Sequence, residues 1–81
     1  MIDPSQIRAA RGLIAISQTE LASRAGLGLA TVKRIEGTTG ELRVTIQTLL
    51  RIRQALEEVG IVFLDQNDEQ GPGVRLKKPL P

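Results

Sequence analysis

The sequence predicts a mainly α-helical domain of four to five helices that ends in a two-stranded β-hairpin. Up to Val59, apolar residues recur at intervals of three and four, the period of helices with one buried face. After Gly60 this period is lost, and two short apolar runs flank a Gly-Pro-Gly turn signal. A chain of 81 residues with 41% hydrophobic content buries one modest core. We expect helices over residues 1–60, a hairpin packed on them over 61–77, and a disordered tail over 78–81.

The chain contains neither cysteine nor histidine. This composition excludes disulfides and removes the usual ligands of zinc. Ser17 and Ser23 have no histidine beside them to act as a base, so we expect no catalytic residue, metal or cofactor, and no enzyme. Because a core of this size is marginal, a second subunit is the remaining source of stability, which favours a homodimer.

The net charge of +2 is unevenly placed. Residues 1–40 carry five Lys or Arg against three Asp or Glu, whereas residues 41–81 carry six of each. The excess in the first half weakly favours a polyanion as partner. No apolar run is long enough for a membrane span, and the N-terminus lacks a signal sequence, so we expect a cytoplasmic protein without a membrane partner.

The first helix is expected to begin after Asp3, which can cap it, with Pro4 at the first helical position. Gln6 completes the pattern of a capping box, and Gly12 lies near the expected end. The residues expected to face the core are Ile7, Ala10 and Leu13, with Arg8 and Arg11 on the other side.

Two short helices follow. Ser17 and Glu20 have the spacing of a capping box before the second helix, and Gly26 ends that helix through a positive φ. A third helix is expected over residues 28–36, closed by Gly37. The positions expected inside are Leu21, Ala22, Ala25, Val32 and Ile35. Helices of about eight residues are marginal alone, so these two are expected to pack against each other.

Thr45 is expected to cap a longer fourth helix that reaches Val59 and stops at Gly60. Its expected apolar stripe is Ile46, Leu49, Ile52, Leu56 and Val59. Residues 61–64 and 74–77 are then expected to pair as strands. The acidic stretch 65–70 between them lacks the glycine and terminal glutamate of a calcium-binding loop, so it is better explained as a solvated turn than as a cation site.

Two phrases within residues 17–37, "SQTELASRAG" and "ATVKRIEG", carry a more specific pattern. Five residues fall at characteristic positions of one motif: Gln18, Ala22, Gly26, Val32 and Ile35. This pattern resembles the helix-turn-helix of phage lambda repressor and Cro-like proteins, the Xre family, over about residues 5–60. The resemblance implies a lambda-repressor-like DNA-binding domain whose third helix enters the major groove of B-DNA.

Carried over position by position, the resemblance implies three groups of site residues. The base-reading positions are Gly28, Leu29, Ala30, Lys33 and Arg34. The phosphate contacts are Gln18, which also has a buttressing role, Thr19, Thr38, Thr39 and Arg43. Arg11 and Glu36 match a structural ion pair between the first and third helices, with a phosphate contact as the competing role of Arg11. The alternative for Lys33 and Arg34 is a solvated basic face.

The third helix departs from many members of that family in its first residues. It opens with Gly28, Leu29 and Ala30, where hydrogen-bonding residues are common. Leu29 or Ala30 can touch a thymine methyl group, and Arg34 can hold guanine O6 and N7 with its fork of donors. Because two reading positions are apolar, the shape and deformability of the DNA are expected to carry more of the specificity.

These expectations combine into a sequence-specific DNA-binding transcriptional regulator, with a repressor as the expected type and double-stranded DNA as the partner. The alternative is an antitoxin-like protein that binds a partner toxin protein and regulates its own expression through the same domain. Co-purification with a second protein from the native host favours the antitoxin.

The hairpin takes the place at which many members of the family carry a fifth helix for dimerisation. A two-stranded hairpin is marginal alone and has unpaired edges. Either Ile61 and Phe63 or Val62 and Leu64 cover the helices, and the other pair is then apolar and in water. We therefore expect a homodimer through residues 61–76, with a hairpin that only caps a monomer's core as the alternative. The expected interface residues are Val62, Phe63, Leu64, Val74 and Leu76.

Overall fold

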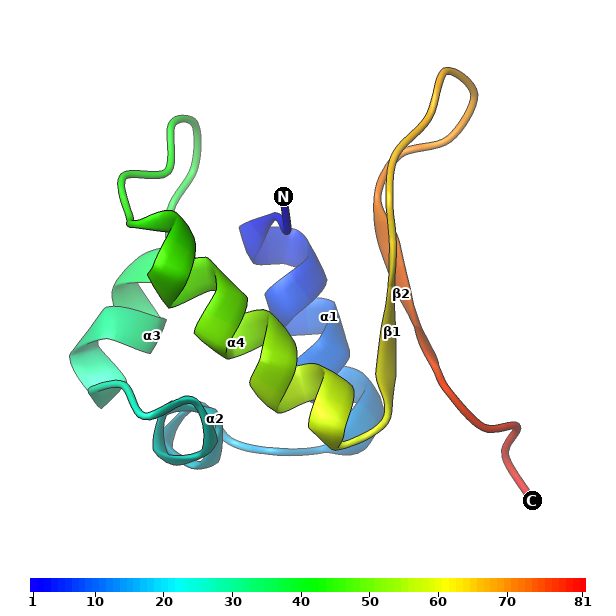
Figure 1. Ribbon diagram of the computed structural model, residues 1–81, viewed down its shortest axis with the longest axis horizontal. Coiled ribbons are helices and arrows are strands. Elements are labelled where there is room, and N and C mark those ends of the chain that lie inside the picture. The colour runs from blue at the N-terminus through cyan, green and yellow to red at the C-terminus, as the bar shows by residue number, and fades with distance from the viewer.

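Four helices lead into one antiparallel hairpin in the computed structural model, which describes residues 1–81. The elements are α1 (Pro4–Ile14), α2 (Gln18–Ala25), α3 (Leu29–Glu36), α4 (Ile46–Glu58), β1 (Ile61–Leu64) and β2 (Gly73–Leu76). In Figure 1, α4 runs diagonally through the middle of the molecule, with α3 on one side of it and the hairpin on the other. The expected mainly helical class with a C-terminal hairpin is confirmed, and the number of helices is four.

The start of α1 follows from its first residues. The Asp3 side chain accepts the main-chain N–H of Ser5, Gln6 Oε1 accepts the N–H of Asp3 at 2.8 Å, and Pro4 occupies the first turn. Ile7 and Ala10 are fully buried, as expected. This capping box satisfies N–H groups that have no partner within the helix, and so sets where α1 begins.

One residue of α1 that we expected in the core is exposed instead. Leu13 is 46% exposed, and Ile14 packs against the core instead. The buried side of α1 is therefore formed by Ile7, Ala10 and Ile14. Ala10 and Ile14 lie three and seven residues after Ile7. Leu13 lies one position away from this line and turns toward solvent.

A tight turn separates α2 from α3. The Ser17 hydroxyl accepts the Glu20 N–H at 3.0 Å, but the Glu20 carboxylate binds Arg24 Nε at 2.9 Å, so the reciprocal half of the expected capping box is replaced by a salt bridge within the helix. Gly26 ends α2 with a φ of +68°, and the Leu27 N–H donates to the Ala22 carbonyl at 2.9 Å. This geometry returns the chain directly into α3.

The fourth helix begins where the sequence predicts, because the Thr45 hydroxyl accepts the Thr48 N–H at 3.1 Å. Ile46 was expected to face the core but is 61% exposed. It lies in the first turn, where the helix emerges from the surface loop 37–45, and no element covers it there. Further along, Ala55 is buried at a position that the apolar stripe had left out.

The hairpin packs its inner face on the helices. Ile61 lies opposite Leu76, and Phe63 lies opposite Val74. Ile61 and Phe63 are buried, and Val74 and Leu76 pack against the same core. Of the two orientations that the sequence left open, Ile61 and Phe63 therefore cover the helices. The guanidinium carbon of Arg53 on α4 lies 5.3 Å from the centre of the Phe63 ring, a cation–π distance that ties α4 to β1.

A buried amide joins α1 to the end of the hairpin. Gln6 is 4% exposed, and its Nε2 donates to the carbonyls of Leu64, at 3.2 Å, and Gly73, at 2.9 Å. All of the buried side-chain polar atoms of the chain have a hydrogen-bond partner. Gln6 therefore fixes the hairpin on α1 without leaving a polar group unpaired in the core.

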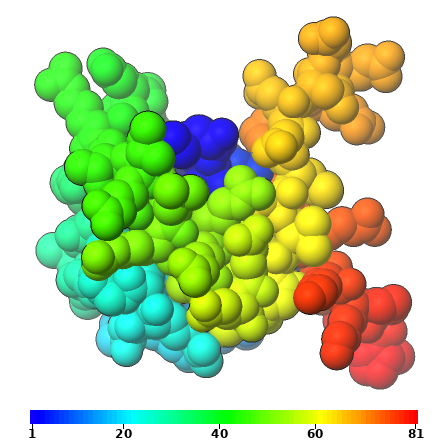
Figure 2. Space-filling view, in the orientation of Figure 1, coloured from blue at the N-terminus to red at the C-terminus, as the bar shows by residue number.

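The surface view in Figure 2 shows the hairpin turn and the C-terminal residues projecting from the packed helices. Residues 78–81 have no regular secondary structure and are exposed. None of the helices combines the length and the apolar character that crossing a membrane requires.

Candidate nucleic-acid interface

One face of α3 is fixed against the core and the other is open. Val32 and Ile35 are fully buried, and Glu36 is 4% exposed. The exposed positions of this helix and its cap are Gly28, Leu29, Ala30, Lys33 and Arg34, all five of the expected base-reading residues. An open face on a helix that is held from behind is what docking of α3 into a groove requires.

The beginning of α3 is uncovered. Gly28 caps the helix through its main chain alone, with its carbonyl accepting the N–H groups of Thr31 and Val32. A Cβ at Gly28 would meet no atom within 4 Å, so the space in front of this helix end is open. The N–H groups of Leu29 and Ala30 have no hydrogen-bond partner within the chain, so a phosphate or base edge can approach them.

Glu36 is the centre of a polar cluster that joins three helices. Its carboxylate accepts two hydrogen bonds of 2.7 Å from Arg11, which is the ion pair expected from the resemblance. Gln18 Nε2 donates to the same carboxylate at 3.2 Å. The Arg11 guanidinium also donates to the Ile16 carbonyl at 3.1 Å. The cluster thus binds α1 and the start of α2 to the end of α3.

Gln18 and Thr19 occupy the first turn of α2. Gln18 is half-buried, and its bond to Glu36 gives it the buttressing role that the resemblance implied. The second amide hydrogen of Gln18 remains free to reach a phosphate. Thr19 is exposed and has no side-chain hydrogen bond, so its hydroxyl is available.

The loop after α3 carries the other expected phosphate contacts. The Thr38 hydroxyl donates to the Arg34 carbonyl at 2.7 Å, which makes it a helix-end contact as well as a half-buried loop group. Arg34 Nη1 donates to the Arg43 carbonyl at 3.2 Å, so this base-reading candidate is braced by the loop. Thr39 is exposed. The Arg43 side chain is 85% exposed and lies 3.9 Å from Glu41, too loosely held to be neutralised.

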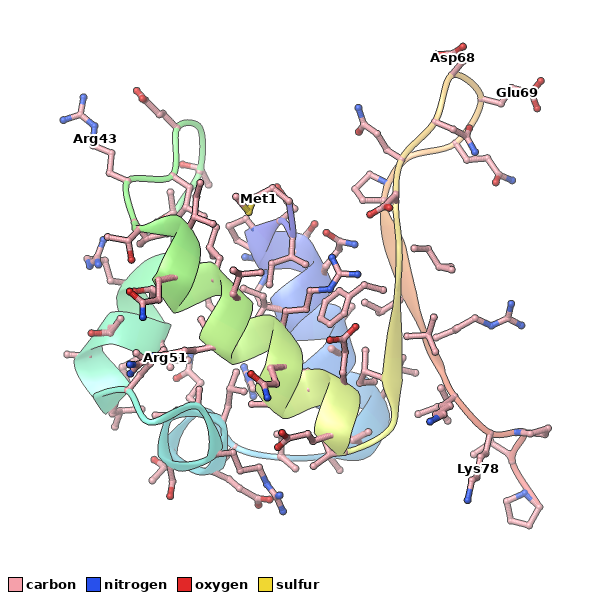
Figure 3. The ribbon with its side chains drawn as sticks, viewed as in Figure 1. Met1, Arg43, Arg51, Asp68, Glu69 and Lys78 are labelled. Carbon is pink, nitrogen blue, oxygen red and sulfur yellow. The ribbon has the colours of Figure 1, made fainter.

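Figure 3 shows how the charged groups are distributed. Arg43 extends into solvent from the loop before α4, whereas Asp68 and Glu69 lie at the tip of the hairpin and Lys78 lies beyond its other end. The acidic turn is therefore well separated from the exposed face of α3. An approaching polyanion meets the cations of α3 and its loop without meeting the acidic hairpin turn.

Two arginines make contacts at α3, or at the turn before it, that the sequence does not predict. Arg8 was expected only to lie opposite the core, but its Nη1 donates to the Glu36 carbonyl and so caps the last turn of α3. Arg51 on α4 approaches the turn between α2 and α3, with Nη1 3.9 Å from the position of a Cβ on Gly26. Both contacts join residues far apart in the chain, and no local sequence pattern signals them.

The expected dimer-interface residues divide between the two faces of the hairpin. Phe63 is 7% exposed and belongs to the core of its own subunit, and Val74 and Leu76 pack on the same core. Strand alternation directs these three side chains toward the helices of their own subunit, and their expected contact with a second subunit stays a prediction. Val62 and Leu64 are on the outer face, and Leu64 is 41% exposed.

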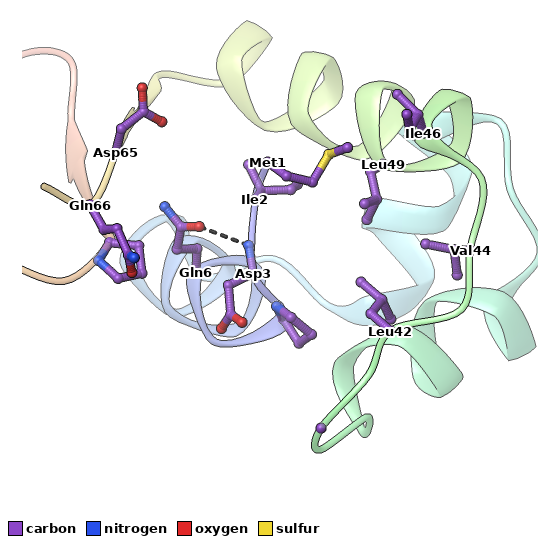
Figure 4. Close-up of a pocket in the computed structure, with 13 residues that line it drawn as sticks. Met1, Ile2, Asp3, Gln6, Leu42, Val44, Ile46, Leu49, Asp65 and Gln66 are labelled. Atoms are coloured by element: carbon purple, nitrogen blue, oxygen red, sulfur yellow. Dashed lines mark hydrogen bonds between the residues drawn. The ribbon is translucent and has the colours of Figure 1, made fainter.

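A hollow of about 620 Å³ lies between the N-terminus, the loop before α4 and the start of the hairpin turn. Figure 4 shows Asp3, Leu42 and Asp65 among the residues that line it, and the hydrogen bond from the Asp3 N–H to Gln6. The polar side chains at its rim belong to exposed residues or, in the case of Gln6, are already paired. Nothing in this lining selects a particular ligand.

No model of a known protein family matches this chain, and no curated protein matches its sequence.

Proposed function

We propose that the protein is a sequence-specific DNA-binding transcriptional regulator that inserts α3 into the major groove of B-DNA. One observation carries this proposal. The inner face of α3 is fixed by Val32, Ile35 and Glu36, while small, apolar and basic side chains on its outer face are exposed. The major groove, about 12 Å wide, admits an α-helix presented in this way.

The connection between α2 and α3 supports the same role. Two helices of eight residues each are joined through Gly26 at positive φ, and Ala22, Val32 and Ile35 are buried between them and the core. These residues are among the five that resemble the helix-turn-helix of lambda repressor and Cro-like proteins. We propose that the whole helical part, residues 1–60, is a domain of this kind.

Each exposed residue of α3 then has a role. Arg34 keeps donors free after its bond to the Arg43 carbonyl and reads a guanine, while Lys33 contacts a base or phosphate beside it. Leu29 and Ala30 touch thymine methyl groups at the start of the helix. With so few hydrogen-bonding groups at that end, the shape of the DNA contributes to specificity.

The backbone of the DNA is held from the start of α2 and from the loop that follows α3. Thr19 and the free amide hydrogen of Gln18 contact phosphates at the start of α2, and Thr39 and Arg43 do so from the loop. The Thr38 hydroxyl donates to the Arg34 carbonyl and its main-chain N–H donates to the Ile35 carbonyl at 3.2 Å, so Thr38 orients this loop and reaches a phosphate only if its hydroxyl hydrogen leaves the Arg34 carbonyl. We propose a homodimer that occupies two half-sites, and a repressor, since occupancy of an operator is enough to block other proteins from it.

The test begins with selection of bound sequences from random DNA duplexes by the purified protein. On the selected operator, Arg34→Ala should weaken binding by about 1–3 kcal/mol and relax the preference at one base position in each half-site. Lys78→Ala removes the same charge at the far end of the molecule and should leave affinity and preference nearly unchanged. The proposal is wrong if selection enriches no sequence or if Arg34→Ala binds the operator as tightly as the wild type.

A further inference from the structure

The pairing of the hairpin shows which main-chain groups face its edges. The Lys77 N–H donates to the Gly60 carbonyl at 2.8 Å, just beyond the paired residues. In an antiparallel ladder, hydrogen-bonded and non-hydrogen-bonded pairs alternate. Val62 and Leu64 therefore bond to β2, and the N–H and C=O groups of Ile61 and Phe63 point away from it, along the free edge of β1.

This edge has no partner within the chain. Outside the pairing of β1 with β2, no main-chain or side-chain hydrogen bond reaches the N–H or C=O of Ile61 or Phe63. Two donors and two acceptors thus lie along the free side of β1, on the two residues whose side chains are buried. Unpaired edges of this kind attract another strand.

We propose that β1 pairs antiparallel with β1 of a second copy of this chain, about a two-fold axis that passes beside Val62. In this register Ile61 lies opposite Phe63 of the partner subunit, and the reverse pair follows from the symmetry. All four free groups of each edge are then satisfied, and the two hairpins form one sheet in the order β2-β1-β1-β2. This proposal builds on the homodimer named above and specifies how it is made.

The side chains at the axis favour the β1 edge over the β2 edge. Pairing through β1 places Val62 directly opposite Val62 of the partner subunit, and β-branched cross-strand pairs stabilise a sheet. Pairing through the free edge of β2 would place Arg75 opposite its own copy at the same short distance. Like charges directly opposite each other are destabilising, so a symmetric dimer uses β1.

The helices beside β1 supply a second contact. The hairpin packs on α4 through β1 and on α1 through β2, so joining the two β1 strands brings the two copies of α4 side by side. On α4, Ile46 and Leu50 are 61% and 55% exposed, and Met1 beside them is 72% exposed. Apolar side chains of this size gain from being covered, and a second α4 is positioned to cover part of them.

The same arrangement is compatible with DNA binding. A two-fold axis perpendicular to the shared sheet leaves the helices of both subunits on one face of it. Figure 1 shows α3 on the far side of the helices from the hairpin. Both copies of α3 therefore face the same way, as two half-sites on one side of a duplex require.

A single cysteine introduced by substitution tests this register directly, because the wild-type chain contains no cysteine. Non-hydrogen-bonded antiparallel pairs have Cα atoms about 4.5 Å apart, within the range of a disulfide. Val62→Cys should form a disulfide-linked dimer rapidly under mild oxidation. Arg75→Cys, on the same outer face one strand away, should remain mostly monomeric on a non-reducing gel. Equal cross-linking of the two variants, or none by Val62→Cys, overturns the proposed register.

A second measurement needs no new covalent bond. Sedimentation equilibrium should show a dimer for the wild type and for Val62→Thr, and a monomer for Val62→Arg, which puts two cations at the axis. Circular dichroism of Val62→Arg should remain that of the folded chain. A monomeric wild type at high micromolar concentration overturns the proposal. It is also overturned if the free edge of β1 becomes covered only when a different protein binds to it.

The outcomes also separate this proposal from the proposed function. A folded Val62→Arg monomer should bind an isolated half-site like the wild type but lose the additional affinity of the complete operator. A wild-type dimer that binds no DNA refutes the regulator and leaves the strand pairing in place. A DNA-binding protein whose operator affinity is unchanged by Val62→Arg refutes the strand pairing alone.

Discussion

Arg11 on α1 and Glu36 at the end of α3 are joined by two hydrogen bonds of 2.7 Å, from Nε to Oε2 and from Nη2 to Oε1. The side chain of Glu36 is 3% exposed and that of Arg11 is 22% exposed. The hydrogen bonds with Glu36 raise the pKa of Arg11 above its usual value, because they stabilise the charged guanidinium. The pair therefore fixes the end of the proposed recognition helix on the core by a two-point contact.

Removing one partner of this pair should be costly. Arg11→Met retains most of the aliphatic stem but leaves the Glu36 carboxylate buried without its cation, and we expect a loss of about 3 kcal/mol in the free energy of unfolding. Urea denaturation measures it. Arg24→Met breaks the exposed pair with Glu20 and should cost less than about 1 kcal/mol. Similar losses in the two variants would contradict a specific role for the buried pair.

Replacing two of the glycines by alanine should change the free energy of unfolding in opposite directions. Gly26 has a φ of +68°, and a left-handed conformation costs a residue with a Cβ about 1–2 kcal/mol, so Gly26→Ala should lower the free energy of unfolding by that amount. Gly12 lies inside α1 with open space around it, and Gly12→Ala should raise it by about 0.5–1 kcal/mol. Thermal unfolding of both variants tests this prediction. A change of the free energy of unfolding in the same direction in both variants would contradict it.

The cap of α1 should depend on pH. Hydrogen bonds from the Ser5 hydroxyl and then the Ser5 N–H lower the pKa of Asp3, with a smaller contribution from the charge of Arg8. Because the folded-state pKa is the lower one, the stabilisation is complete above the unfolded-state pKa, about pH 4, and is lost as the pH falls through the folded-state value.

Asp3→Asn provides the matched control for this pH dependence, because asparagine also caps helices but carries no charge. The difference in free energy of unfolding between the wild type and Asp3→Asn should be constant near neutral pH and should change in the acidic range in the direction that disfavours the wild type. A difference that does not vary down to strongly acidic pH would mean that the Asp3 carboxylate contributes no charge-dependent stabilisation.

DNA binding should weaken steeply as salt is added, because phosphate contacts release counterions. Arg43→Ala should reduce the slope of log affinity against log salt by about one unit per half-site and leave base preference unchanged. Lys78→Ala serves as the charge-matched control and should not alter the slope. Fluorescence anisotropy over a range of salt concentrations measures both. A wild-type slope near zero would exclude phosphate contacts altogether.

Local sequence was sufficient for where three of the helices begin and where α2 ends, but α1 runs to Ile14, beyond the end expected near Gly12. Asp3, Ser17 and Thr45 each cap a helix, and Gly26 and Gly60 have the positive φ that ends one and begins the hairpin. These features depend on hydrogen bonds and backbone preferences within about four residues. A reader of the sequence can therefore place them without knowing how the helices pack.

The open face of α3 was also predictable, because Val32 and Ile35 have helical spacing and leave Lys33 and Arg34 on the other side. The ion pair between Arg11 and Glu36 was reached differently, through a resemblance to a known motif. No spacing within the chain connects two residues 25 positions apart.

Only the tertiary structure decided which side of the hairpin is inside. Strand alternation divides the hairpin into two faces, but packing on α1 and α4 decided that Phe63 turns inward and Val62 outward. Leu13 and Ile46 lie at the margins of the core, where no other segment covers them, and are exposed to solvent. Gln6 bonds to a carbonyl 58 positions away, at Leu64. Local hydrogen bonding and periodicity set what each segment becomes and most of the buried face of each helix. In the hairpin and at the margins of the core, burial depends on which distant segment lies against a side chain, and no local pattern contains that information.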